Sequence, residues 1–293
     1  MTIAVYGSRR QHDNLSQLRA FIRAAAQANI RLLVHTKLFR HIKEEMPDAF
    51  EGADAREVVD IDALCPDYAV SIGGDGTFLR TAAWVGDRNI PILGVNTGHL
   101  GFLSALDCGD LPLIPLALTN ADELFRIEPR SLIHVSSPSL DASGVWPYAL
   151  NEVALLKEET ASMIVANTHI GAEPLANYYA DGLIVSTPTG STAYNLSIGG
   201  PLVQPDLDVH IIAPVAAHSL SMRPLVVGTS KPITIIPGGR APHLRLAIDG
   251  RSLRVNNGET IIITRAPFQI RILQGKTHTF TDTLRRKLHW GEE

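Results

Sequence analysis

One acidic residue stands among three glycines at residues 73–77, which read Gly-Gly-Asp-Gly-Thr. The apolar segment at residues 68–72 predicts a short buried strand before this cluster, and residues 77–85 predict a helix after it. A strand, a glycine turn and a helix N-terminus leave backbone N–H groups free to bind a phosphate. Glycine also lets a ligand come close to the backbone. The segment therefore predicts a phosphate site.

Asp75 is unusual at such a site because a carboxylate repels a phosphate. It fits if it accepts a proton from an attacking hydroxyl, or if it holds Mg²⁺ against the phosphates. The alternative is an Asp-Gly turn that ends a strand. Arg80, on the helix that follows, either adds positive charge to the phosphate site or lies on a solvated helix face. The local sequence leaves these alternatives open.

A second glycine-rich turn, residues 94–102, follows an apolar strand predicted at residues 90–95. Ligands of parallel sheets bind at the carboxyl ends of the strands. Both glycine turns come at such ends, so we expect them to form the floor and wall of one pocket. Two unrelated tight turns, each needing glycine for a positive φ, are the alternative.

Residues 179–201 form a long polar stretch rich in hydroxyls and glycines. Small hydroxyl side chains suit ribose and phosphate, and Tyr194 is suited to stacking on a base. A loop of this length without a function is uncommon, so we favour a binding loop over a plain connection. Asn151 and Glu152 interrupt an apolar run, and a carboxylate–amide pair can hold two ribose hydroxyls. A polar pair at a strand edge is the alternative for these two residues.

The first part of the chain alternates strand and helix signals that would position these residues. Strands are predicted at residues 3–7, 31–35, 58–61, 69–72 and 90–95, and helices at residues 15–28, 37–46, 77–85 and 111–118. The last of these helices is the weakest, because it contains Pro112 and Pro115. This βαβ order predicts a Rossmann-like α/β domain with a parallel sheet covered by helices.

From about residue 126 the pattern becomes that of an all-β domain. Strands are predicted at residues 132–135, 149–156, 162–169, 183–186, 210–214, 225–227, 233–236, 244–248, 260–264 and 269–273. Many short strands with glycine and proline turns predict a layered antiparallel sandwich. We therefore expect an α/β domain at residues 1–125 and a β-sandwich domain at residues 126–276. The basic segment at residues 277–293 is expected to pack back on the first domain.

Bulk properties narrow the class of protein. The chain has 293 residues, is 45% hydrophobic and carries a net charge of −4, so charge gives no reason to expect nucleic acid. Its two cysteines suit a reducing compartment, and no secretory signal is evident at its start. The uncharged residues 182–205 are too polar for a membrane span. His210 and His218 are interpreted as scattered polar or core positions. A cytoplasmic protein is expected.

The motifs together resemble the NAD kinase family over essentially the whole chain. They are Gly-Gly-Asp-Gly-Thr, the turn containing Asn96, Leu100 and Phe102, the Asn-Glu pair, and Thr-Pro-Thr-Gly-Ser-Thr-Ala-Tyr at residues 187–194. The first motif is also similar to that of 6-phosphofructokinases and of diacylglycerol and sphingosine kinases. The Thr-Pro segment together with Asn-Glu is more specific.

The resemblance implies phosphorylation of the adenosine ribose 2′-hydroxyl of NAD⁺ by ATP–Mg²⁺, which gives NADP⁺. It implies an α/β domain followed by a β-sandwich, assembly into dimers or tetramers, and Asp75 as the proton acceptor. It assigns the adenosine to Asn151 and Glu152, the nicotinamide-side ribose to Asp181, and an apolar pocket to Phe102. Ligand contacts are implied for Gly74, Asp75, Gly76, Arg80, Phe102, Asn151, Glu152, Asp181, Thr189, Thr192, Ala193, Tyr194, Asn195, Ser197 and Ala216.

Two positions depart from the family pattern. Tyr179 stands where some members carry Arg, and Gly250 stands where others place a side chain that reaches the ligand.

Two other functions remain as alternatives. A diacylglycerol-type lipid kinase shares the first motif, but the Asn-Glu pair and the Thr-Ala-Tyr segment favour a dinucleotide acceptor. A non-catalytic NAD(H)-binding regulator would not need Asp75.

Overall fold

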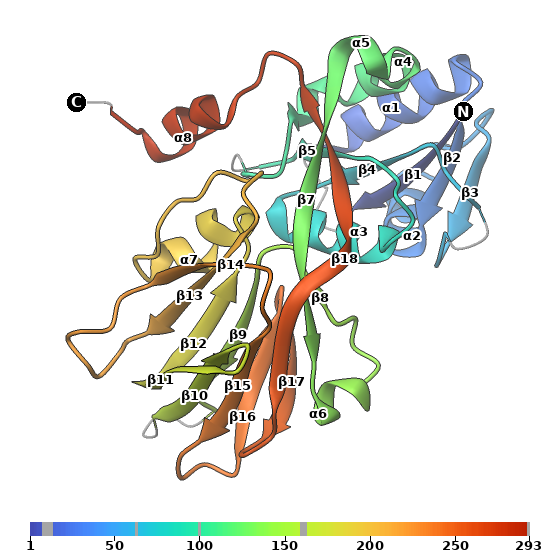
Figure 1. Cartoon of the computed structure of the whole chain (residues 1–293). Coiled ribbons are helices and arrows are strands. Elements are labelled where there is room, and N and C mark those ends of the chain that lie inside the picture. Colours follow the sequence, from blue (N-terminus) through green and yellow to red (C-terminus); the bar gives the residue numbers. More distant parts are fainter. Residues whose placement is uncertain (8–13, 62–63, 99–100, 159–162, 292–293) are drawn as a thin grey trace. The chain divides into compact units, whose positions relative to one another are not determined.

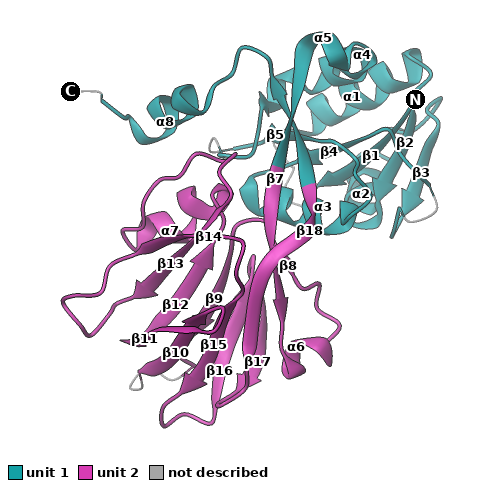
Figure 2. Ribbon diagram, in the orientation of Figure 1, with its two compact units in different colours: residues 1–129, 270–293 teal, residues 130–269 magenta. Residues whose placement is uncertain are grey.

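The computed structural model describes residues 1–7, 14–61, 64–98, 101–158 and 163–291. It consists of two compact units, which Figure 2 colours separately: residues 1–129 with 270–293, and residues 130–269. Two strands, β7 (Phe125–Ser136) and β18 (Ile261–Gly275), continue from one unit into the other. The first unit is therefore discontinuous in sequence, and the second is a single stretch of chain.

Unit 1 is built on a mostly parallel sheet (Figure 1). Its strands run in the order β3-β2-β1-β4-β5-β18, with β6 beside β5. Their bounds are β1 (Thr2–Gly7), β2 (Arg31–His35), β3 (Ala55–Val58), β4 (Tyr68–Ile72), β5 (Ile92–Asn96) and β6 (Leu106–Asp107). Buried apolar residues of the sheet pack with those of the helices in one core. The strands are apolar on consecutive positions, as expected for a sheet that is covered on both faces.

Among the described residues of unit 1, helices lie between β1 and β2, between β2 and β3, and between β4 and β5; further helical segments follow β6 in succession, and the last helix follows β18. Their bounds are α1 (Leu15–Gln27), α2 (Thr36–Glu45), α3 (Asp75–Val85), the 3₁₀ segment η2 (Cys108–Leu113), α4 (Ile114–Thr119), α5 (Ala121–Leu124) and α8 (Phe280–Leu288). The helix predicted at residues 111–118 is thus divided between η2 and α4. Pro112 lies inside η2, where its ring prevents a regular α-helix.

Unit 2 is an antiparallel β structure of two sheets with a common core. One sheet has the order β14-β13-β12-β9-β16-β17, and the other contains β11, β10, β15 and the first part of β18. The bounds are β8 (Tyr148–Ala149), β9 (Glu152–Leu156), β10 (Ile164–Ile170), β11 (Glu173–Ala180), β12 (Gly182–Ser186), β13 (Val209–Val215), β14 (Leu225–Gly228), β15 (Ile233–Gly238), β16 (His243–Ile248) and β17 (Arg251–Asn256). The short helical segments among the described residues of this unit are α6 (Pro138–Asp141), η3 (Thr189–Thr192) and α7 (Tyr194–Ser197).

The predicted fold class, an α/β domain and an antiparallel all-β domain, is confirmed. Several details differ. The single strand predicted at residues 149–156 is broken at residues 150–151, β18 is one strand where two were predicted, and β11 and β17 were not predicted. The strand predicted at residues 162–169 begins outside the described residues. His210 is buried in the core, and His218 is exposed.

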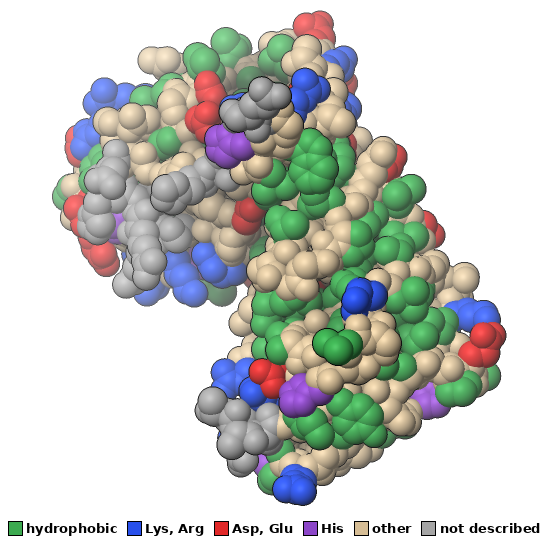
Figure 3. Space-filling view, turned by 90° about the vertical axis from the view of Figure 1, so that its left-hand side faces the viewer, with side chains coloured by type: hydrophobic (Ala, Val, Ile, Leu, Met, Phe, Trp, Pro, Cys, Tyr) green, Lys and Arg blue, Asp and Glu red, His purple; other side chains and the backbone are tan. Residues whose placement is uncertain are grey.

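On the face of the molecule that Figure 3 shows, acidic and basic side chains are interspersed among hydrophobic ones. The exposed hydrophobic side chains of unit 2 include Leu225 and Val226 of the edge strand β14. Across the part of the chain that the structure describes, the helices are too short or too polar to traverse a lipid bilayer.

Candidate active site

Asp75 is the first residue of α3, two residues earlier than the sequence predicted the helix to begin. Its Oδ2 accepts a hydrogen bond from the backbone N–H of Phe102 at 2.8 Å, and its Oδ1 accepts one from Leu103 at 3.1 Å. The carboxylate is therefore half-buried and held in one orientation, rather than free in an exposed turn. The turn after β5 and the turn after β4 meet at this side chain, as the pocket hypothesis requires.

Two of the nearby glycines are required by the local structure. Gly73 has a φ of 149°, and a Cβ there would lie 2.5 Å from Thr77 Oγ1. A Cβ on Gly101 would lie 2.0 Å from Asp75 Oδ1, so a side chain at that position would displace the carboxylate. These two residues explain part of the glycine pattern by packing and backbone conformation alone.

Gly74 and Gly76 have no such explanation. Both are exposed and have a negative φ. A Cβ on Gly74 would meet nothing within 4 Å among the described residues, and one on Gly76 would meet only the guanidinium of Arg80, at 4.0 Å. Neither position needs glycine for the protein's own packing. The free space on either side of Asp75 is what the close approach of a phosphate to the backbone would require.

Arg80 lies on the same helix, one turn after Gly76. Its Nη2 donates a hydrogen bond to Thr77 Oγ1 at 3.1 Å, and the residue is exposed. The side chain is thus directed back toward the N-terminal turn of α3. This placement is compatible with both roles considered above for Arg80, a positive charge at the phosphate site and a residue on a solvated helix face.

The Asn151–Glu152 pair lies where the backbone leaves a regular strand. The carboxylate of Asp249 accepts the backbone N–H groups of Leu150, Asn151 and Glu152, at 2.7, 2.9 and 3.1 Å. These three N–H groups cannot all pair with a neighbouring strand, which is why β8 and β9 are separate. The prediction of one continuous strand over residues 149–156 is therefore wrong at the Asn-Glu pair, because the strand is interrupted there.

The surroundings of Glu152 disfavour the charged form of its carboxylate. Burial and the charge of Asp249 raise the pKa of Glu152 to about 7, while a backbone hydrogen bond from Tyr194 lowers it. Its Oε2 atom is buried and has no hydrogen-bond partner among the described residues. A buried oxygen without a partner is unfavourable unless a ligand donates to it. The group is therefore well suited to accept hydrogen bonds from hydroxyls of a bound sugar.

Many hydroxyls of the long polar loop bind the protein itself. Thr187 Oγ1 donates to the carbonyl of Leu150 at 2.5 Å and accepts the N–H of Gly190 at 3.0 Å. A Cβ on Gly190 would lie 2.1 Å from the carbonyl oxygen of Asn151. The loop is thus anchored to the segment that carries the Asn-Glu pair. Asn151 itself is largely buried.

The other predicted ligand residues of unit 2 differ in exposure. Tyr194 and Ser197 are exposed, whereas Thr192 and Ala193 are half-buried. Asn195 is fully buried, and its Nδ2 donates to the carbonyls of Ser191 and Pro201, at 3.3 and 3.1 Å. This placement favours a structural role for Asn195. Thr189 is buried too, and Ala216 is exposed just after β13 with a φ of 47°.

Asp181 follows β11 and forms an ion pair with Lys157. The Lys157 ammonium lies 2.7 Å from Asp181 Oδ1. The sequence analysis did not single out Lys157. Tyr179, the departure from the family pattern, is exposed two residues earlier, so Lys157 supplies a cation near Asp181 although the Arg found in some members is missing.

Comparison with known proteins decides which family these features belong to. Residues 10–114 match the ATP-NAD kinase N-terminal domain, and residues 150–275 match the ATP-NAD kinase C-terminal domain. The chain belongs to the NAD kinase family. A NAD kinase of Porphyromonas gingivalis is 41% identical over 289 residues, which cover 99% of this chain and 98% of that protein.

Two solved structures share the NAD kinase fold of this chain. Yeast NADH kinase, complexed with NADH, has a TM-score of 0.87 at 21% identity and covers 100% of this chain and 89% of its own. A NAD kinase from Archaeoglobus fulgidus, in complex with ATP, has a TM-score of 0.74 at 24% identity, with coverage of 97% and 99%. At these identities the likeness establishes the fold.

Two residues that contact the candidate site, Asp249 and Lys157, were not singled out from the sequence. Asp249 was visible as an acid at the end of an alternating strand, where a turn would be expected. Its buried position beside the Asn-Glu pair depends on pairing between β9 and β16, which are about ninety residues apart in sequence. Leu100, part of the motif in the turn after β5, lies outside the described residues.

Proposed function

We propose that this NAD kinase transfers the γ-phosphoryl group of ATP to the adenosine ribose 2′-hydroxyl of NAD⁺. The observation that carries the proposal is the orientation of Asp75 by two backbone N–H groups, between two glycines that the fold itself does not require. Phosphoryl transfer needs mostly positioning and charge neutralisation, and little covalent chemistry from the protein. A fixed carboxylate beside an open backbone supplies the positioning.

Asp75 would orient the 2′-hydroxyl and accept its proton as the oxygen–phosphorus bond forms. The bond from the γ-phosphorus to the β,γ-bridging oxygen breaks, and ADP leaves with the electron pair. In unit 2, Glu152 and Asn151 would hold the adenosine ribose, with the adenine against Tyr194. Asp181, paired with Lys157, would contact the ribose on the nicotinamide side. The contacts of Asn151, Glu152 and Asp181 described above support these assignments.

Mg²⁺ is expected to act on the phosphates of ATP, where it would neutralise charge. Among the described residues there is no cluster of three or more His, Cys, Asp or Glu side chains that could hold a metal ion. Mg²⁺ in kinases is usually held by substrate phosphates together with one or two carboxylates. Omission of Mg²⁺ from the assay tests this requirement.

The deciding experiment is the formation of NADP⁺ from NAD⁺ and ATP–Mg²⁺ by the purified protein. An NADP⁺-specific dehydrogenase identifies the product and confirms that the 2′-hydroxyl was phosphorylated. Diacylglycerol replaces NAD⁺ in a control reaction. Phosphorylation of the lipid, or binding of NAD⁺ without turnover, would support one of the two alternative functions instead.

We also propose that the protein is cytoplasmic and assembles into dimers or tetramers, as expected of this family. The exposed apolar side chains of Leu225 and Val226 on the edge strand β14 support self-association. Light scattering on the purified protein tests the assembly, and cell fractionation tests the location.

A further inference from the structure

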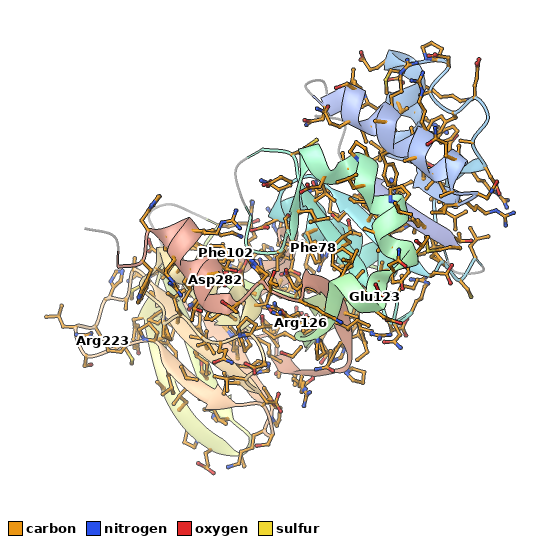
Figure 4. All side chains as sticks on the ribbon, turned by 90° about the horizontal axis from the view of Figure 1, so that it is seen from above. Phe78, Phe102, Glu123, Arg126, Arg223 and Asp282 are labelled. Atoms are coloured by element: carbon orange, nitrogen blue, oxygen red, sulfur yellow. The ribbon has the colours of Figure 1, made fainter. Side chains whose placement is uncertain are left out.

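Lys287 of the C-terminal helix α8 lies close to the Asp75 site within unit 1. Its ammonium nitrogen is 4.4 Å from the centroid of the Phe102 ring. The backbone N–H of the same Phe102 donates to Asp75 at 2.8 Å. In Figure 4, Phe102 lies beside α8, the helix that also carries Asp282. One residue of the turn after β5 thus contacts both the cation and the carboxylate.

The position of α8 is defined by its first turn. Thr279 and Asp282 form a reciprocal capping box, in which each side chain binds the backbone N–H of the other residue. His278 and Thr283 form a side-chain hydrogen bond of 2.7 Å, and Thr283 is buried. A capped helix of this kind presents the residues of its last turn in a fixed direction.

The Lys287 ammonium is buried and has no hydrogen-bond acceptor among the described residues. Burial lowers the pKa of Lys287 to about 8, and the charge of Asp75 opposes that shift. Asp107 and Asp110 lie near Lys287 in a cavity of about 230 Å³, but their carboxylates cap the backbone of η2. A buried ammonium without an acceptor is unfavourable, and an incoming anion would remove that penalty.

Arg80 is another cation near Asp75, and its side chain is exposed. Arg80 donates to the Thr77 hydroxyl of its own helix. The sequence contains no Gly-x-x-x-x-Gly-Lys-Ser/Thr motif, so no lysine is supplied by a phosphate-binding loop of that kind. Phosphoryl transfer nevertheless benefits from a positive charge on the transferred group.

We propose that Lys287 is a catalytic residue that binds the terminal phosphates of ATP beside Asp75. The inference rests on the proposed function and on the role of Asp75 in it. Lys287 takes part in no covalent step. The proton of the acceptor hydroxyl goes to Asp75, the electron pair of the broken bond leaves with ADP, and the ammonium stabilises the negative charge on the phosphoryl oxygens.

Three variants test the proposal: Lys287→Met, which keeps the length and removes the charge, Lys287→Arg, which keeps the charge, and Arg285→Met as a control. Arg285 is exposed on the same helix. Loss of a charge-assisted hydrogen bond is expected to lower kcat of Lys287→Met by about 10-fold to 100-fold. Lys287→Arg should recover part of this loss, and Arg285→Met should stay within about threefold of wild type, as for a typical exposed ion pair.

Binding measurements separate phosphate contact from packing. Calorimetry is used to compare AMP with an ATP analogue that has a methylene group in place of the β,γ-bridging oxygen. Lys287→Met should weaken binding of the analogue and leave AMP unchanged. Equal weakening of both, or a kcat within about threefold of wild type in Lys287→Met, would overturn the proposal, since a lost charge-assisted contact has a larger effect.

A thermal melt of each variant shows whether the chain is folded, and Lys287→Gln replaces Lys287→Met if the latter is not. The two proposals fail differently. A wild-type protein that makes no NADP⁺ refutes the proposed function. A wild-type protein that makes NADP⁺, with a Lys287→Met variant that is equally active, refutes only the role of Lys287.

Discussion

At the scale of single residues, the side chain on which the chemistry depends most is Asp75. Asp75→Asn is expected to lower kcat by about 10²-fold or more, the usual contribution of a general base. The structure also indicates that Asp75→Asn lowers the stability of the fold, which the sequence did not predict. The amide of Asn would place an NH₂ group against one of the two backbone N–H donors, so some loss of stability is expected as well.

Steady-state kinetics and urea unfolding on the same preparation separate the two effects of Asp75→Asn. Asp122→Asn, at an exposed acid on α5, is a matched control. A nearly normal kcat in Asp75→Asn would remove this residue from the chemistry, whatever happens to its stability.

Glu152 allows a prediction about pH. Its folded-state pKa of about 7 lies above its ordinary value of 4.5, mainly because of burial. Between these pH values the folded protein binds more protons than the unfolded chain, so the free energy of unfolding falls as the pH rises. Glu152→Gln removes this dependence. The variant should gain on the order of 2–3 kcal/mol over wild type above pH 7, and nothing below about pH 4.

Urea unfolding of Glu152→Gln and wild type at pH 4, 6 and 8, values chosen to span the titration, measures this difference. A difference in the free energy of unfolding that stays constant with pH would contradict the prediction.

The Glu152→Gln substitution should also weaken NAD⁺ binding by about 10- to 150-fold, because an amide replaces a charged acceptor. Calorimetry with NAD⁺ gives that value. Unchanged affinity together with a large drop in melting temperature would make Glu152 a structural residue.

Substitution of Tyr194 should change the KM for NAD⁺ more than the KM for ATP. Tyr194 is 37% exposed at the start of α7, so its ring is accessible to an adenine. Tyr194→Ala should raise the KM for NAD⁺ more than the KM for ATP, because stacking of a base on an aromatic ring contributes about 1–3 kcal/mol. Initial rates with each substrate varied in turn provide the test. An equal rise in both KM values would indicate packing.

At the scale of elements, the segment between β8 and β9 depends on Asp249. This buried carboxylate accepts three backbone N–H groups, and removing it leaves all three without a partner. Asp249→Ala should therefore lower the free energy of unfolding by at least about 2 kcal/mol and weaken NAD⁺ binding, because each unsatisfied buried donor is costly. Urea unfolding and calorimetry measure both. Arg254→Ala, at an exposed position of β17, serves as the control, and unchanged stability of Asp249→Ala would contradict the interpretation.

The elements that the sequence predicted well are those with a strong local signal. β4 and α3 were predicted because an apolar run, a glycine turn and a helical pattern follow one another. β11 and β17 were missed because half of their residues are exposed and β17 contributes only two apolar side chains, Leu253 and Val255. Tertiary packing determines such strands more than local preference does.

The residues of the candidate site also divide into those with a strong local sequence signal and those placed by tertiary contacts. Asp75, Glu152 and Tyr194 have motifs that stand out in the sequence. Asp249, Lys157 and Lys287 act through contacts with residues that are distant along the chain, and the sequence alone gave no reason to place them there. Asn195 was selected with its motif, whereas its burial and its bonds to the loop indicate a structural role.

At the scale of the whole molecule, the C-terminal segment belongs to unit 1 although unit 2 lies before it in sequence. α8 contributes only one buried residue, Thr283. Deletion of residues 277–293 should therefore leave a folded protein that still binds NAD⁺ but turns over at least about 10-fold more slowly, because Lys287 is lost. A thermal melt, calorimetry and kinetics on the truncated chain test this. Full activity of the truncated protein would contradict it.

The continuity of β18 has a consequence for synthesis of the protein on the ribosome. Ile272 and Leu273 of this strand pair with β5 of unit 1, whose other elements, apart from α8, all begin before residue 130. Until residues 272 and 273 leave the ribosome, Ile92 and Leu93 of β5 lack this pairing partner. The nascent chain thus carries an unfinished sheet throughout translation of unit 2. An unpaired sheet edge promotes aggregation, so the nascent chain is expected to be most prone to aggregate during this interval.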